Sequence, residues 1–85
     1  GQVWAVALSP DGKTLAVAMG GTEGEGAVAL FDFETGKEIA FVLEAKPVRC
    51  IAFSPDGKLL ATGDFERKLK LRDPRTAETK RVLEG

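Results

Sequence analysis

The side chains of this sequence that could take part in chemistry are carboxylates, bases and a single thiol. The chain has no histidine, so it offers neither a Ser-His-Asp or Cys-His nucleophile pair nor a histidine-based zinc site. Glu23 and Glu25 are close in sequence, but they lie among glycines on a segment too mobile to hold a catalytic geometry. We therefore expect no catalytic residue, no metal site, no cofactor and no enzyme activity.

Two other carboxylates belong to a repeated motif. Identical Ser-Pro-Asp-Gly-Lys segments occupy residues 9–13 and 54–58, and each follows an apolar run of strand length. Proline presets φ for a turn, aspartate caps the turn with its side chain, and glycine takes the left-handed position. The residues assigned to these turns are Asp11, Gly12, Asp56 and Gly57. We also assign structural roles to Asp32 and Asp73, which close later apolar runs in the two halves.

The stretches around these turns predict an all-β protein. No stretch shows helical periodicity, and short apolar runs alternate with turn signals. Eight strands are expected, at residues 3–8, 14–19, 27–32, 38–43, 47–53, 59–62, 68–73 and 79–83. The last four repeat the order of the first four, since Val3 matches Val48 and Asp32 matches Asp73. A period of roughly 40 to 45 residues with four strands is the size of one propeller blade.

The repeated motifs resemble those of the WD-repeat β-propeller family over essentially the whole chain. The resemblance rests on the two Ser-Pro-Asp-Gly-Lys turns, on Thr35-Gly36-Lys37 after Phe31-Asp32, and on Leu83-Glu84-Gly85. It implies two four-stranded antiparallel β-propeller blades, residues 1–45 and 46–85. Propellers of the YVTN and TolB-like kinds share the Ser-Pro-Asp-Gly-Lys turn, so a ligand-sensing propeller of that kind is an alternative.

Several positions depart from the pattern of the WD-repeat family. Glu44-Ala45 replaces the Gly-His pair that precedes a blade, and Phe31 and Arg72 replace the tryptophans near the end of the third strand. The acidic turn positions of the family fall on Glu25 and Glu66. The resemblance thus implies that the buried polar network of the family is largely absent from this chain.

The two blades are expected to need partners. Two blades cannot close a ring, and their outward faces are expected to carry apolar side chains such as Leu15, Val17, Val42, Leu60 and Leu83. The first blade has seven acidic and two basic residues, and the second has six acidic and ten basic residues. This asymmetry favours head-to-tail association of identical chains, as a trimer or a tetramer within the about 4 to 8 blades of known propellers. A piece of a longer propeller is the alternative.

Four residues are candidates for binding a protein or peptide partner. Trp4 and Arg49 occupy equivalent places near the start of the first strand of each blade, which in the family lies beside the central channel. Both residue types are enriched in binding hot spots. Glu23 and Glu25 lie on a flexible glycine-rich loop, residues 20–26, that is expected to project from the same face. Simple packing between blades is the alternative role for Trp4.

The other basic side chains and the thiol are assigned ordinary roles. Lys68, Lys70 and Arg72 share one face of a strand, and we expect solvated lysines and an Arg72 paired with an acidic neighbour such as Glu66. Cys50 is expected to be a buried apolar residue. The balance of 12 basic and 13 acidic residues argues against nucleic acid, and no apolar run approaches the ~20 residues that span a membrane. A cytoplasmic location is the default.

The function expected from the sequence is that of a non-catalytic, WD-repeat-like scaffold for protein–protein interaction that self-associates head to tail into a closed propeller. A purely structural or designed propeller fragment, whose only activity is self-assembly, is the alternative from another class. Binding to peptides separates the two hypotheses, because only the scaffold has a partner other than itself.

Overall fold

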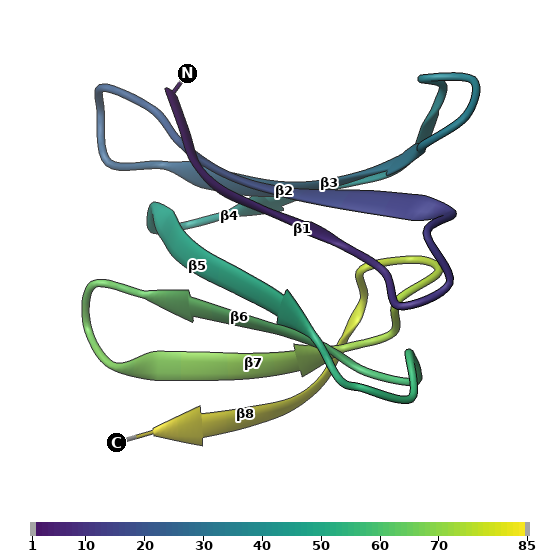
Figure 1. Ribbon diagram of the computed structural model, residues 1–85. Coiled ribbons are helices and arrows are strands. Elements are labelled where there is room, and N and C mark those ends of the chain that lie inside the picture. The colour runs from purple at the N-terminus through teal and green to yellow at the C-terminus, as the bar shows by residue number, and fades with distance from the viewer. Residues whose placement is uncertain (1, 85) are drawn as a thin grey trace.

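A computed structural model describes residues 2–84 and places them in eight strands that form two antiparallel sheets (Figure 1). The strands are β1 (Gln2–Leu8), β2 (Thr14–Gly20), β3 (Gly26–Asp32), β4 (Glu38–Glu44), β5 (Val48–Phe53), β6 (Leu60–Asp64), β7 (Lys68–Arg72) and β8 (Thr79–Glu84). Every expected strand is present, and the all-β fold class with two four-stranded antiparallel sheets is confirmed. The outer ends of the two blade ranges, residues 1 and 85, lie outside the described residues.

Both sheets are simple meanders, with the strand orders β1-β2-β3-β4 and β5-β6-β7-β8. They lie face against face, and β5 of the second sheet runs beside β1 and β2 of the first (Figure 1). The loops between β2 and β3 and between β6 and β7 emerge at one end of the molecule, and the Ser-Pro-Asp-Gly-Lys turns lie at the other. The repeated sequence thus produces two copies of one supersecondary unit.

The first Ser-Pro-Asp-Gly-Lys turn is held by its own side chains. Oδ1 of Asp11 accepts hydrogen bonds from Ser9 Oγ at 2.5 Å and from the backbone N–H of Lys13 at 3.0 Å. These two bonds, the serine bond foremost, hold the pKa of the Asp11 carboxyl below its ordinary value. Gly12 has φ 75°, a left-handed conformation that a residue with a Cβ adopts at a cost. The turn therefore depends on the residue types that occupy it.

The second turn reproduces this geometry. Asp56 Oδ1 accepts hydrogen bonds from Ser54 Oγ at 2.6 Å and from the backbone N–H of Lys58 at 2.9 Å. These bonds, again with the serine bond first, lower the pKa of Asp56. Gly57 has φ 74°. Identical sequence has thus given nearly identical local structure in the two sheets.

The turns that join the third and fourth strands of each sheet begin at an aspartate. Asp32 Oδ1 accepts a hydrogen bond from the backbone N–H of Thr35 at 3.0 Å, and Asp73 Oδ1 accepts one from that of Arg75 at 2.8 Å. The second of these turns places Ala77 at φ 64°, a left-handed conformation that costs a non-glycine residue about 1 kcal/mol or more. Ala77 is fully buried, so its methyl packing and its backbone contacts offset that strain.

The hydrophobic core lies between the two sheets. Small and branched side chains from the middle of the first sheet meet the inner face of the second, and the buried residues are Ala16, Ala18, Val28, Leu30, Val48, Ile51, Leu60 and Ala77. The alanines of β2 let the backbones approach closely, as interiors of high packing density require. Leu60 and Val42 were expected on outward faces, and this expectation was wrong. Leu60 is fully buried in the core and Val42 packs against it.

Each sheet keeps one apolar face outside this contact. On the first sheet one cross-strand row of that face consists of Val6, Val17, Ala29 and Phe41. On the second sheet one row of the face that lies outside this contact consists of Cys50, Gly63, Leu69 and Leu83. Cys50 is exposed rather than buried as expected, because its side chain points to the face that no other strand of the described chain covers. The ends of these rows are exposed, at Val6 and Phe41 on the first sheet and at Cys50, Leu69 and Leu83 on the second, whereas the middle residues Val17, Ala29 and Gly63 are buried.

Candidate functional site

Trp4 and Arg49 occupy equivalent irregularities in the two sheets. The β1–β2 register runs from the Val3–Met19 pair to the Ala5–Ala18 pair, so that Trp4 has no partner residue on β2. In the second sheet the β5–β6 register skips Arg49 in the same way. A β-bulge of this kind bends the strand and re-aims the side chain of the extra residue. Both side chains are accordingly exposed at the same end of the molecule.

Phe65 brings these two bulge residues together. The Trp4 and Phe65 rings meet edge to face with centroids 5.4 Å apart and planes at 79°. The guanidinium carbon of Arg49 lies 5.4 Å from the centroid of the Phe65 ring, within the range of a cation–π contact. We call these three residues the Trp4 cluster. Sequence reasoning missed Phe65, because its place in the β6–β7 loop gives no sign of which side chains the loop covers.

Two residues beneath the indole fix its position. A Cβ on Gly20 would lie 2.6 Å from Trp4 Nε1 and 2.7 Å from Pro47 Cβ, so only glycine leaves room for the ring at this place. Pro47 belongs to the connection between the two sheets. Trp4 is thus an exposed side chain whose ring contact with Phe65 joins the first sheet to the β6–β7 loop of the second. The partner-binding role of Trp4 stays a prediction.

Glu23 and Glu25 lie in the β2–β3 loop, and both side chains are exposed. The loop is shorter than expected: Gly20 and Gly26 belong to the strands and pair with each other, and the Gly21 N–H donates to the Glu25 carbonyl at 2.8 Å. Among residues 2–84, no ion pair, cation–π or aromatic contact joins either glutamate to the Trp4 cluster. The glutamates and the Trp4 cluster are therefore separate features, although the β2–β3 and β6–β7 loops emerge at the same end of the molecule (Figure 1).

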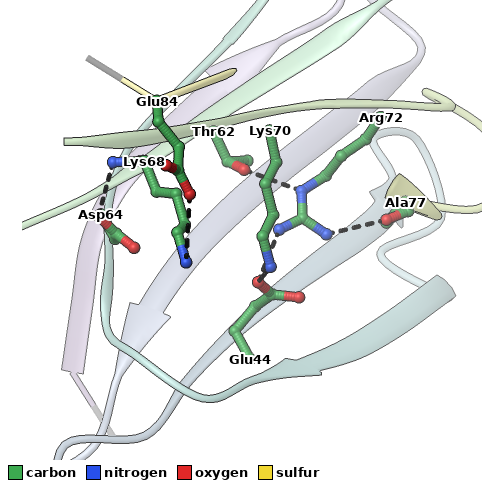
Figure 2. Close-up of polar contacts among 8 residues, drawn as sticks. All are labelled: Glu44, Thr62, Asp64, Lys68, Lys70, Arg72, Ala77 and Glu84. Carbon is green, nitrogen blue, oxygen red and sulfur yellow. Dashed lines mark hydrogen bonds and ion pairs between the residues drawn. The ribbon is translucent and has the colours of Figure 1, made fainter. Parts of the chain in front are cut away.

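A second site lies between the two sheets and is centred on Arg72, whose side chain is 1% exposed. Arg72 Nε donates to Thr62 Oγ1 at 2.8 Å, and Nη1 donates to the Ala77 carbonyl at 3.0 Å (Figure 2). Nη2 lies 3.1 Å from Glu44 Oε1, at the end of the first sheet. Lys70 Nζ donates to the same Glu44 oxygen at 2.5 Å. We call Glu44, Thr62, Lys70 and Arg72 the polar cluster.

The partner expected for Arg72 was wrong. Glu66 pairs instead with Lys46, at 3.1 Å between two exposed side chains. Arg72 pairs across the sheets with Glu44, because its alternation in β7 points it towards the first sheet together with Lys70. The sequence did contain an indication that Glu44 and Arg72 belong together. Glu44 occupies the Gly-His position and Arg72 the tryptophan position of the WD-repeat pattern, so both departures from the pattern belong to one buried network.

The polar cluster keeps Glu44 ionised. Burial alone acts to raise the pKa of this carboxyl, whose side chain is 11% exposed. The hydrogen bond from Lys70 and the positive charges of Lys70 and Arg72 act in the opposite direction and outweigh burial, so the pKa of Glu44 lies below its ordinary value. The first sheet therefore offers a fixed negative charge to two cations of the second.

Two further findings concern the chemistry of the chain. Within residues 2–84, no group of three or more histidine, cysteine, aspartate or glutamate side chains is arranged to hold a metal ion. In the same part of the chain, no helix is long and apolar enough to cross a membrane.

The first prediction concerns the ion pair between the sheets. Replacing Glu44 by glutamine leaves the buried guanidinium without a counter-charge, and we expect the free energy of unfolding to fall by about 3 kcal/mol. The matched control is Glu66→Gln, which breaks the exposed pair with Lys46 and is expected to cost less than about 1 kcal/mol. Urea denaturation of both variants measures the difference. Equal losses would contradict the role assigned to Glu44.

The second prediction concerns acid. Because the pKa of Glu44 is lowered in the folded state, its contribution to stability is complete above the unfolded-state pKa of about 4.3 and is lost as the pH falls through the lower folded-state value. We therefore expect the stability difference between the wild type and Glu44→Gln to shrink as the pH falls from about 6 to about 3. The lowered pKa values of Asp11, Asp56 and Asp73 act equally in both proteins. A difference that stays constant with pH would contradict the prediction.

Comparison with known proteins connects this geometry to a family. The sequence model of the family described as "WD40: WD domain, G-beta repeat" matches residues 1–32 and 37–73. The "WD repeat-containing protein SL1-17" of Schistosoma mansoni is 40% identical over 73 residues, which are 86% of this chain and 23% of that protein. "Eukaryotic translation initiation factor 3 subunit I" of Scheffersomyces stipitis is 43% identical over 65 residues, 75% of this chain and 17% of that protein.

Solved structures show the same fold. The crystal structure of RRP9 WD40 repeats and the structure of U3-55K each superpose with a TM-score of 0.84 at 19% identity, covering 98% of this chain and 26% of those chains. The chain thus spans about a quarter or less of the length of the proteins it matches. The family match extends over most of the residues and through both sheets, and the chain belongs to the WD-repeat β-propeller family.

Proposed function

We propose that this chain is a non-catalytic scaffold for protein–protein interaction whose propeller is completed by head-to-tail association of identical copies. Family membership supports the first part, because WD-repeat proteins typically bind other proteins and are generally not catalysts. The observation that carries the second part is the equivalence between the exposed face of the second sheet and the buried face of the first.

This equivalence extends to single residues. On the first sheet the row that faces the second sheet consists of Ala5, Ala18, Val28 and Val42. The exposed row of the second sheet with the same register consists of Cys50, Gly63, Leu69 and Leu83. Both rows are small on the first two strands and branched on the last two. The exposed row therefore has the shape that accepts a neighbouring sheet.

The exposed face of the first sheet supplies a matching surface. Its row through Val6, Val17, Ala29 and Phe41 corresponds in register to a row of the second sheet that consists of Ile51, Thr62, Lys70 and the exposed Val82. At its two middle positions the first-sheet row has the apolar residues Val17 and Ala29 where the second-sheet row has Thr62 and Lys70, and its outer members Val6 and Phe41 are exposed. Contact with the Leu69 face of another copy would therefore bury apolar atoms on both sides, at about 25 cal/mol per Å².

The distribution of charge between the two halves of the chain also favours head-to-tail association. The seven acidic and two basic residues of positions 1–45 would lie beside the ten basic and six acidic residues of positions 46–85 of the next copy. A contact between two different faces generates a ring when its rotation closes. A trimer supplies six blades and a tetramer eight, both within the about 4 to 8 blades of known propellers.

A partner surface completes the proposal. The Trp4 cluster combines a tryptophan, an arginine and a phenylalanine, and tryptophan and arginine are residue types of binding hot spots. We propose it as the site for a protein or peptide, with Glu23 and Glu25 at the same end of the molecule as further contacts. One relative is named as a subunit of a translation initiation factor, which is consistent with work inside a larger complex. Our proposal is a cytoplasmic protein without nucleic acid or membrane partners.

The third prediction tests the association. Native mass measurement at micromolar concentration should give a trimer or a tetramer, and Leu69→Asp should dissociate it while circular dichroism keeps its β signal. Phe33→Asp is the matched control, because Phe33 is also an exposed apolar side chain but lies in the β3–β4 turn, outside both sheet faces. A stable wild-type monomer would exclude the ring and leave the faces to be covered by further blades.

The fourth prediction tests the partner surface. On a peptide array, Trp4→Ala and Phe65→Ala should each weaken binding by about tenfold or more, the usual effect of truncating a hot-spot aromatic. The native mass should stay that of the wild type. Phe33→Ala provides the control for loss of an exposed aromatic ring. If no peptide binds while the assembly forms, the chain is a purely structural unit instead.

A further inference from the structure

The polar cluster has more positive than negative charge. Lys70 Nζ and Arg72 Nη2 converge on one oxygen of one carboxylate, Glu44 Oε1, at 2.5 and 3.1 Å. The side chains of Glu44, Lys70 and Arg72 are 11%, 29% and 1% exposed. Buried charges are normally matched by partners of opposite sign. The polar cluster therefore carries one positive charge more than its negative charge. Of its three charged side chains, Lys70 is the most exposed to water.

Arg72 also has unused hydrogen-bonding capacity. Its Nε and Nη1 donate to Thr62 and Ala77. Nη2 is buried and, although it lies near Glu44, it is not aligned to donate a hydrogen bond to any acceptor among residues 2–84. Nearly all buried polar atoms in folded proteins have such a partner. A buried guanidinium nitrogen with free N–H groups is a ready donor to an anion.

A cavity adjoins these groups. It has a volume of about 170 Å³ and is lined by Lys70, Arg72, Thr62 and Glu44, with Lys46 and Lys68 at its rim. Asp64 also lines it, but Oδ1 of this residue accepts the backbone N–H groups of Glu66 and Lys68. The charged lining residues are four bases and three acids, so the cavity as a whole is positive.

The rim lysines have weakly held partners. Lys68 lies 3.9 Å from Glu84 (Figure 2). Lys46 pairs with Glu66 at 3.1 Å, and all four side chains are exposed. Exposed pairs of this kind contribute little and exchange readily with water and ions. The rim can therefore turn its lysines towards an anion that enters the cavity.

We propose that this cavity binds a small oxyanion of the phosphate type. Arg72 Nη2 and Lys70 Nζ donate to it from the buried end, and Lys46 and Lys68 add attraction at the entrance. Glu44 remains the shared counter-ion of the two inner cations, and the bound anion compensates the charge that Glu44 leaves over. This site lies between the sheets of one chain and does not rest on the partner surface or on the association proposed above.

The probe is inorganic phosphate, added to the full chain at constant ionic strength with sodium chloride as the compensating salt. We expect a saturable rise in Tm and a saturable 31P chemical-shift change. Lys70→Gln removes the excess charge but keeps the Glu44–Arg72 pair, and should weaken phosphate binding by about tenfold, the effect of one charge-assisted hydrogen bond. Lys80→Gln, on exposed β8, removes the same charge away from the cavity and should bind phosphate as the wild type does.

Three results would overturn the proposal. The first is the absence of any saturable response in the wild type, and the second is an equal loss of affinity in the Lys70→Gln and Lys80→Gln variants. Circular dichroism establishes whether Lys70→Gln folds. If it does not, Lys68→Gln at the rim replaces it and should weaken binding by about threefold through the loss of one nearby charge. Unchanged affinity in the variant that is used is the third.

Discussion

The structure depends on the burial of sheets that are apolar on both faces. A four-stranded sheet of this kind can bury one face against one neighbour, and the two sheets of this chain do so for each other through Ala16, Ala18, Leu30 and Leu60. The outer face of the second sheet repeats the spacing of small and branched residues seen on the inner face of the first. One type of contact between sheets therefore accounts both for the hydrophobic core and for the surfaces that the described residues leave open.

The polar cluster adds specificity to this contact. A buried ion pair contributes little net stability when compared with apolar residues of similar size, but the loss of one partner is costly. Arg72 satisfies Nε and Nη1 within its own sheet and takes its counter-charge, Glu44, from the other. A different neighbour, or a shifted one, would leave the guanidinium buried without an anion. The apolar residues allow the two sheets to pack, and Arg72 selects the partner and the register.

Sequence reasoning predicted the repeated parts of the fold and missed the contacts between the repeats. The strands and the turns at Asp11 and Asp56 follow from local rules, because proline, aspartate and glycine fix a turn without help from distant residues. Period-two alternation assigns neighbouring residues such as Leu59 and Leu60 to opposite faces, but it does not say which face is inside. That choice depends on the twist and stacking of the sheets. The exposure of Cys50 and the pairing of Arg72 with Glu44 depend on the same stacking.

At the bulges of Trp4 and Arg49, the choice of side chain is independent of the pairing between strands. A residue in a regular strand must suit its cross-strand neighbour, so that a change there alters the sheet. Trp4 and Arg49 have no such neighbour, and their strands pair regularly on either side of them. The side chain at each bulge can therefore be exchanged while the hydrogen-bonded ladder stays the same. Two blades built on one backbone plan can therefore carry side chains as different as an indole and a guanidinium at this place.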